Sequence, residues 1–310
     1  MSINISGVIG LSVLKKGNDK IFIFFDDHDN QKYCKKNNNF FISNFCEEII
    51  KKYPNEIVLI LEEPFLEKRE KIKVLWENTE HLYVFRNFYT KLINKCNKTK
   101  ICYGFPTDLR LAIINFTFDK EYASKHPNDP IYQENVLTYF SKLLDLFDII
   151  NLNQNSNVMI FIKKVFSNFK NSDYYLKLKK KVITFYETFL KNNLDKTIYQ
   201  LLSMYPEVYH FKKGYPFEDD RDEYNFFDEF DSILSGIMEF YMLIIILTNN
   251  KNIKIVYSGY YHSYNLKYIL KKYFNYQIIY ENGITDNIEY INDSKIINCV
   301  SVPEEIFSNN

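Results

Sequence analysis

Four short apolar runs, each ending in polar side chains that can take part in chemistry, constrain the fold of this chain more than any other feature. They lie within residues 20–27, 56–64, 99–110 and 253–262. Apolar runs of this length are typical of strands buried on both faces of a sheet. Segments whose apolar residues have helical spacing lie between most of these runs, and strands joined through helices pair in parallel. The pattern therefore predicts an α/β fold with a mostly parallel central sheet and helices on both faces. A hairpin turning at Gly17 and Asn18 leads into the first run.

The same patterns divide the chain into three stretches. Residues 1–110 carry the first part of the α/β sheet domain. In residues 111–250 the apolar side chains recur at spacings of three and four, which predicts a mainly helical insertion with one long loop near 206–224. Residues 251–310 carry the last strands and a helix, and we expect them to complete the same sheet, with a final strand at 294–300.

Charge and hydropathy disfavour two classes of partner. The chain has 39 basic and 39 acidic residues, whereas proteins that bind nucleic acids or anionic membranes carry a basic excess or a basic face. The most apolar segment, residues 233–247, contains Glu239 and is shorter than the roughly 20 residues that span a bilayer. We therefore expect neither a nucleic-acid partner nor a membrane partner, and we interpret the segment as a buried core helix.

The cysteines and the N-terminal residues favour a reducing compartment. The cysteine count is odd and no pair has C-x-x-C spacing; the five are Cys34, Cys46, Cys96, Cys102 and Cys299. Residues 1–10 lack the basic start and long apolar core of a signal peptide. These features predict an intracellular protein with reduced thiols.

Polar side chains at the ends of the four predicted strands suggest a site. Ligands of open parallel sheets bind beyond the carboxyl ends of the strands, and these ends share one edge when the strands are neighbours. A single acid or histidine at a strand end is more typical of a helix cap or a turn. Recurrence at four ends favours one shared cleft instead. The candidate catalytic residues are Asp26, His28, Glu62, Asp108, Arg110 and His262.

Two kinds of chemistry suit these side chains. Imidazole and carboxylate groups from His28, Glu62 and His262 could hold a divalent metal ion, which lowers the pKa of a bound water. Alternatively, a histidine oriented by a carboxylate could act as a general base on water, with Arg110 holding an anionic intermediate. A serine nucleophile has less support because the chain has no G-x-S-x-G elbow, and it also has no G-x-G-x-x-G or Walker motif for nucleotides.

The order of these motifs resembles the superfamily of the ChaN, erythromycin esterase, TraB and Tiki proteins. The matching pieces are DDHDN (26–30), LEEP (61–64), DLR (108–110) and GYYH (259–262). About a dozen residues carry the resemblance, and they are spread over most of the chain. The sequence departs from the family pattern at Phe25, where a glycine is usual, and at Asp26, where a glutamate is more common. The surplus of Asn, Lys, Ile, Tyr and Phe indicates an AT-rich genome and resembles the composition of proteins of large DNA viruses, whose compartment would be the host cytoplasm or the virion.

The resemblance implies a role for each matching residue. Asp26 and His28 would occupy the first catalytic position, Glu62 the second, Asp108 with Arg110 the third, and His262 the fourth. The family includes hydrolases, metal-dependent proteases and haem binders. We therefore expect a hydrolase acting on an ester or amide bond of a small molecule or peptide, either with a divalent metal ion or without one. The alternatives are an inactive viral structural or host-interaction protein that binds a protein partner through residues 111–250, and a haem or tetrapyrrole binder.

Overall fold

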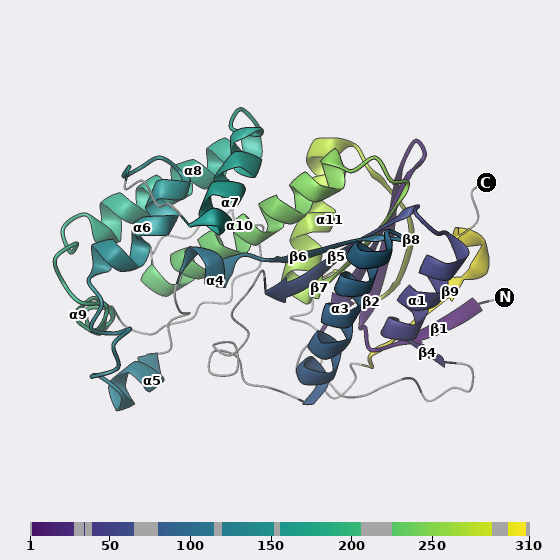
Figure 1. Cartoon of the computed structure of the whole chain (residues 1–310), viewed down its shortest axis with the longest axis horizontal. Helices are drawn as coiled ribbons and strands as arrows, with labels where there is room; N and C mark the ends of the chain where they lie inside the picture. Colours follow the sequence, from purple (N-terminus) through teal and green to yellow (C-terminus); the bar gives the residue numbers. More distant parts are fainter. Residues whose placement is uncertain are drawn as a thin grey trace. The chain divides into compact units, whose positions relative to one another are not determined.

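The computed structural model describes most of the chain as two compact units (Figure 1). The described residues are 2–27, 34, 39–64, 80–114, 120–151, 156–205, 225–286 and 297–307. The first unit comprises Met1–Glu63, Trp76–Asp108 and Met242–Asn310, and the second comprises Pro64–Leu75 and Leu109–Tyr241. His28 and residues 206–224 lie outside the described residues, so the structure does not bear on the long loop expected there.

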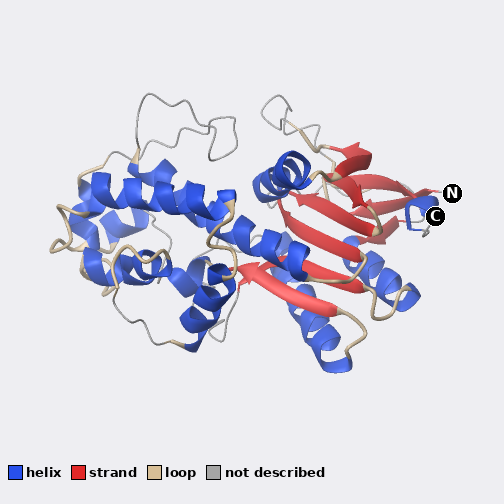
Figure 2. Ribbon diagram, turned by 90° about the horizontal axis from the view of Figure 1, so that it is seen from above, coloured by secondary structure: helices blue, strands red, loops and turns tan. Residues whose placement is uncertain are grey.

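A large sheet forms the centre of the first unit (Figure 2). It has six strands in the order β6-β5-β7-β3-β2-β8. Its strands are β2 (Gly10–Lys16), β3 (Asp19–Asp26), β5 (Ile57–Pro64), β6 (Tyr103–Asp108), β7 (Ile253–Gly259) and β8 (Gln277–Gly283). Both β3 and β5 pair in parallel with β7, whereas β2 is antiparallel to β3 and to β8. The prediction of an α/β fold with a mostly parallel sheet is confirmed.

Two hydrogen bonds show that β6 also runs parallel to β5. Before the strands begin, the Asn55 N–H donates to the Ile101 carbonyl at 2.7 Å. Near their ends, the Thr107 hydroxyl donates to the Leu61 carbonyl at 2.9 Å. The two strands therefore begin side by side and end side by side, which makes them parallel. The carboxyl ends of β6, β5, β7 and β3 thus share one edge of the sheet. These are the four strands that the apolar runs predict.

The expected hairpin is also present. Strands β2 and β3 pair from Gly10↔Phe25 to Lys16↔Asp19. Gly17 has a φ of 58° in the two-residue turn between them. Glycine adopts such a positive φ at no steric cost, which explains why a glycine occupies position 17 of the turn.

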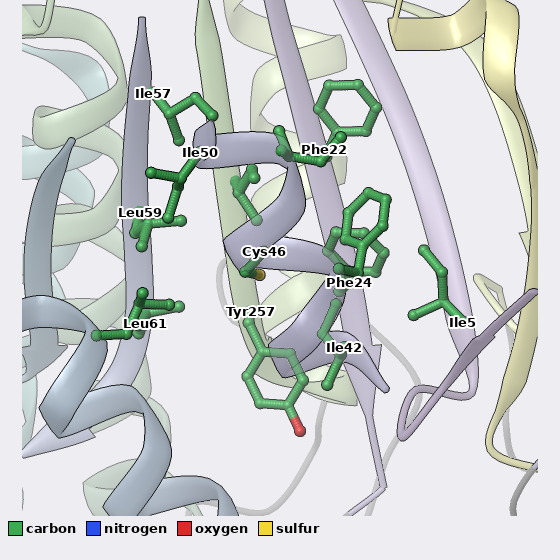
Figure 3. Close-up of a cluster of buried hydrophobic side chains, with 14 of the residues drawn as sticks. Ile5, Phe22, Phe24, Ile42, Cys46, Ile50, Ile57, Leu59, Leu61 and Tyr257 are labelled. Carbon is green, nitrogen blue, oxygen red and sulfur yellow. The ribbon is translucent and has the colours of Figure 1, made fainter. Parts of the chain in front are cut away.

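Helices cover both faces of the sheet. On one face, α1 (Ile42–Lys52) and α3 (Glu80–Thr99) bury Cys46, Tyr89 and Leu92 against the strands. Figure 3 shows Ile42, Cys46 and Ile50 of α1 beside strand residues of this core. On the other face, α11 (Tyr260–Phe274) contacts β3 and β7. The Ser263 hydroxyl of α11 donates to the Phe24 carbonyl at 3.0 Å, which fixes this helix on the strand.

A three-stranded sheet in the order β4-β1-β9 differs from the expectation for the last strand. It contains β1 (Ser2–Ser6), β4 (Asn39–Phe41) and β9 (Cys299–Pro303), and a short 3-10 helix, Glu304–Phe307, follows β9. The strand predicted at 294–300 is thus shifted, and it pairs antiparallel with β1 rather than completing the large sheet. Gly7, with a φ of 95°, turns the chain between β1 and β2, so β1 is a separate strand on which β9 pairs.

Four of the cysteines are joined in pairs in the structure. Cys34 is joined to Cys299 with their Cα atoms 5.0 Å apart, and Cys96 to Cys102 with theirs 4.6 Å apart. Cys46 is a buried free thiol. The expected compartment, with all thiols reduced, stays a prediction.

The edge strand β6 has a side-chain partner on α3. The Gly104 N–H donates to Asn97 Oδ1, and Asn97 Nδ2 donates to the Gly104 carbonyl, both at 3.2 Å. A Cβ at residue 104 would lie 2.9 Å from Ile93 Cα, so only glycine lets the strand approach the helix this closely.

The second unit is helical throughout its described elements. They are α4 (Arg110–Ile113), α5 (Lys120–Lys125), α6 (Val136–Leu146), α7 (Asn157–Ser167), α8 (Asp173–Phe185), a π-helix (Tyr186–Leu190), α9 (Ile198–Ser203) and most of α10 (Phe226–Thr248). Side chains of Asn135, Ser156 and Ser172 cap α6, α7 and α8. The buried Lys181 and Glu229 form an ion pair at 3.3 Å.

Helix α10 contains the apolar segment 233–247. Among the described residues it is the one helix long and apolar enough to cross a membrane, with a mean hydropathy of 1.8. In its most apolar window 78% of the residues are buried inside the protein. The core helix of a globular protein passes the same test, so this finding is weak evidence for a membrane span. The expectation of a buried helix is confirmed.

Candidate functional site

The ends of three neighbouring strands lie level with one another at the carboxyl edge of the large sheet. Asp26, the last residue of β3, lies opposite Gly259, the last residue of β7. On the other side of β7, Leu61 lies opposite Tyr257. Continuing this register by two residues places Glu63 opposite Gly259 as well. Asp26 and Glu63 therefore flank a residue that has no side chain.

Alternation along the strands assigns each acidic side chain to a face. Leu61 and Tyr257 belong to the core on the side of α1 and α3. Because side chains alternate along a strand, Glu63 lies on that face and Glu62 on the opposite one, towards α11. Asp26 shares the α1 and α3 face with Phe24. Asp26 and Glu63 are 2% and 7% exposed, so two carboxylates are almost completely buried on one face.

Two buried tyrosines accompany the Asp26 carboxylate. Tyr257 of β7 and Tyr89 of α3 are 5% and 2% exposed, and their rings are 4.8 Å apart. Figure 3 shows the Tyr257 ring below Cys46 in the core. Burial, followed by the negative charge of Asp26, raises the pKa of Tyr257 well above its usual value. The Tyr257 hydroxyl stays neutral and interacts with both Asp26 and Tyr89.

The pKa of Tyr89 is raised in the same way. Burial is the largest cause, electrostatic interaction with Cys46 comes next, and the charges of Asp26 and Glu63 add to it, with the hydrogen bond to Tyr257 opposing. Burial also raises the pKa of Cys46 to about 12, and the charge of Glu47 adds to this. The Cys46 thiol is therefore neutral and a weak nucleophile.

On the opposite face, Glu62 and His262 form a pair at the start of α11. The Gly259 N–H, at the N-cap of this helix, donates to Glu62 Oε2 at 2.6 Å. The other carboxylate oxygen, Oε1, lies 3.8 Å from His262 Nε2, and the two side chains are 9% and 11% exposed. The positive end of the helix dipole favours the Glu62 anion.

Asp108 ends β6 at the same edge and is 3% exposed. Gly104 of the same strand packs against Ile93 of α3. Alternation then places Asp108 on the α3 face, the face that also carries Asp26 and Glu63. Arg110 begins α4 and belongs to the second compact unit.

Of the six candidate residues, four thus lie at one edge of the first unit. Glu62 and His262 are in direct proximity, whereas Asp26 and Asp108 lie on the other face. His28 lies outside the described residues. Three site residues are additional to the six candidates: Glu63, Tyr89 and Tyr257. The sequence did indicate that Glu63 shares a strand face with Leu59 and Leu61, because these residues occupy alternate positions. Identifying which groups Glu63 meets on that face requires the register of β5 against β7.

The described side chains at this edge supply only part of a metal site. Among the residues that the structure describes, no group of three or more His, Cys, Asp and Glu side chains could hold a metal ion. Glu62 and His262 are the two described members of the expected metal set, and Glu62 Oε2 already accepts a backbone hydrogen bond. A metal centre would require a third ligand from outside the described residues, as His28 would be.

Comparison of the chain with models of protein families, with curated proteins and with solved structures finds no match in any of the three. The fold and the site together define an α/β protein with buried ionisable side chains at the carboxyl ends of four parallel strands.

Proposed function

We propose that the protein is a hydrolase of ester or amide bonds, with its active site at the carboxyl ends of β3, β5, β6 and β7. The observation that carries the proposal is the Glu62–His262 pair at the N-terminus of α11. An imidazole beside a nearly buried carboxylate is the usual construction of a general base. Its position at the carboxyl ends of parallel strands is the usual place for a ligand in such folds.

In the proposed reaction His262 takes a proton from water as the water attacks a carbonyl carbon. Glu62 stabilises the imidazolium that forms, because its Oε1 lies 3.8 Å from Nε2. The hydrogen bond from the Gly259 N–H fixes the Glu62 carboxylate in this place. Negative charge that develops on the carbonyl oxygen is favoured by the positive end of the α11 dipole. His262 then returns its proton to the leaving group.

The carboxylates on the other face have a different proposed role. Asp26 and Glu63 are held beside the neutral hydroxyls of Tyr257 and Tyr89, and they set the position of the strand ends around Gly259. A metal-assisted form of the same reaction would add His28 to Glu62 and His262, and the metal would supply an activated water. Membership in the ChaN, erythromycin esterase, TraB and Tiki superfamily is part of the proposal, and it rests on the sequence motifs.

The test is a screen with nitrophenyl esters and peptide nitroanilides, applied to the parent and to three variants. His262→Gln and Glu62→Gln keep the size of each side chain and remove its acid–base function. We expect each to lose activity, by about 10²- to 10⁴-fold for His262→Gln. His126→Gln, which changes an exposed histidine of the second unit, is the matched control and should retain full activity. Parent-like turnover of His262→Gln would refute the proposal.

Metal content separates the two forms of the mechanism. Mass spectrometry of the purified parent and of the His28→Ala, His262→Ala double variant would count bound metal per chain. Near-stoichiometric metal in the parent with loss in the double variant would support the metal-assisted form. Activity without metal, abolished by His262→Gln, would support the general-base form.

Protein binding by the helical unit is a second candidate function. Helices α7 and α8 expose the large apolar side chains Ile160, Phe161, Leu176 and Ile183, each 39% to 52% exposed. Exposed apolar side chains of this size are typical of contact surfaces when they are contiguous. The candidate predicts a stoichiometric partner in a pull-down that is lost in the Ile160→Ser, Leu176→Ser double variant. Equal recovery with parent and variant would contradict it.

A further inference from the structure

The second unit contains a pocket of about 320 Å³, to which neither proposed function assigns a role. It lies where the last turns of α6 and α7 meet the first turn of α8. Three lysines line it, namely Lys163, Lys164 and Lys170. Phe166 contributes apolar surface, and Tyr175 also lines the pocket. The pocket therefore combines cationic and aromatic groups, which suits a small anion with an apolar body.

The charges around the pocket leave a positive excess. Lys163 pairs with the buried Asp145 at 2.6 Å, and Lys170 pairs with Asp148 at 2.9 Å. The hydrogen bond from Lys170, and then the charges of Lys170, Lys163 and Lys179, hold the pKa of Asp148 below its usual value against the opposing effect of burial. The three lysines that line the pocket (163, 164 and 170) face two carboxylates (145 and 148), so the local charge is +3 − 2 = +1. This excess attracts an anion.

The Tyr175 hydroxyl is an independent observation that points to a ligand. Tyr175 is 2% exposed, and its buried hydroxyl has no hydrogen-bond partner among the residues that the structure describes. Its ring packs against Phe147 and Phe240, with centroids 5.6 and 6.0 Å away. Burial and then the charge of Asp148 raise the pKa of Tyr175 to about 12, so the hydroxyl remains a donor. A buried donor without an acceptor is destabilising, and an anion in the pocket would supply the acceptor.

We propose that this pocket binds a phosphate monoester with a small aromatic or aliphatic body. The phosphate dianion pairs with Lys164 and Lys170, and one of its oxygens accepts a hydrogen bond from Tyr175. The apolar body lies against Phe166. This binding site belongs to the helical unit and does not depend on the proposed hydrolase activity.

The test is calorimetric titration of the full chain with phenyl phosphate at low ionic strength. We expect saturable binding of one molecule per chain, and weaker binding of inorganic phosphate, which has no apolar body. Tyr175→Phe keeps the ring that packs against Phe147 and Phe240, so the variant retains the fold. Loss of one hydrogen bond to a charged group weakens binding by roughly tenfold or more. Lys170→Gln should weaken binding as well.

Lys180→Gln is the matched control, because Lys180 is an exposed lysine of α8 that does not line the pocket. It should bind phenyl phosphate as the parent does. The proposal would be overturned by an absence of saturable binding, by parent-like affinity of Tyr175→Phe, or by an equal loss in Lys180→Gln and Lys170→Gln. The last result would indicate general attraction of anions to a basic surface. If Lys170→Gln does not fold, Lys164→Gln takes its place in the same comparison.

Discussion

Replacing Tyr257 with phenylalanine should change how the stability of the protein depends on alkaline pH. The folded protein holds Tyr257 neutral because burial and the charge of Asp26 raise its pKa well above the usual value. Below about pH 10 the hydroxyl is protonated in both the folded and the unfolded chain, so the full stability is present. Above that pH the unfolded chain releases the proton and the folded chain retains it. Stability is therefore lost as pH rises towards the folded pKa.

The expected size follows from linkage. Each tyrosine held neutral lowers the free energy of unfolding by about 1.4 kcal/mol for every pH unit above about 10. Tyr89 and Tyr257 together thus contribute a slope of about 2.7 kcal/mol per pH unit in the parent. Tyr257→Phe removes one of these two contributions. At pH 7 the same variant should be less stable by about 1–3 kcal/mol, because the buried Asp26 carboxylate loses the neutral hydroxyl beside it.

The assay is urea unfolding followed by circular dichroism at pH values from 7 to above 10. The two curves of stability against pH should converge as pH rises, with the variant starting lower and falling less steeply. Tyr103→Phe, at a tyrosine that is 38% exposed, is the matched control and should follow the parent. Parallel curves for the parent and Tyr257→Phe would refute the reasoning, since they would mean that Tyr257 ionises alike in the folded and unfolded chains.

Three further predictions concern the framework. Lys181→Met removes the ammonium group that pairs with the buried Glu229 carboxylate, so unfolding in urea should show a loss of about 3–5 kcal/mol. Gly10→Ala places a Cβ 1.9 Å from the Ile284 carbonyl oxygen. The cost should be about 1–3 kcal/mol or more in the same assay, because the backbone must move. If the cysteines are joined as in the structure, protein purified without reductant and then unfolded should show one free thiol per chain, Cys46, in a thiol titration. Five free thiols would mean that neither pair forms, and they would support the reduced state expected from the sequence.

The strands were predictable because their information is local. Each apolar run is followed at once by its polar end, and the four runs become β3, β5, β6 and β7 at neighbouring positions of one sheet. The polar ends could therefore be expected at one edge of the sheet. The face of the sheet on which each polar side chain lies could not be predicted, since it depends on the register between strands. Glu62 and Glu63 are adjacent glutamates that the sequence alone does not distinguish. In the structure Glu62 pairs with His262, whereas Glu63 lies in the core near Tyr89.

Non-local pairing explains the remaining differences. The final strand was expected in the large sheet because a short apolar segment indicates a strand but not the strand with which it pairs. Its partner, β1, lies at the other end of the chain, and the antiparallel register from Ser2↔Pro303 to Ser6↔Cys299 could not be inferred from either segment alone. Arg110 was grouped with Asp108 because only Leu109 separates them, but the boundary between the compact units falls between Asp108 and Leu109.

The contact between Asn97 and Gly104 has a consequence for self-association. An open sheet edge presents N–H and C=O groups on which a second chain can add a strand, and this is a common start of aggregation. At Gly104 of the edge strand β6 both groups are already taken by the amide of one side chain. Asn97 thus acts as a one-residue substitute for a neighbouring strand. A polymer that grows by adding strands to β6 would first have to displace it.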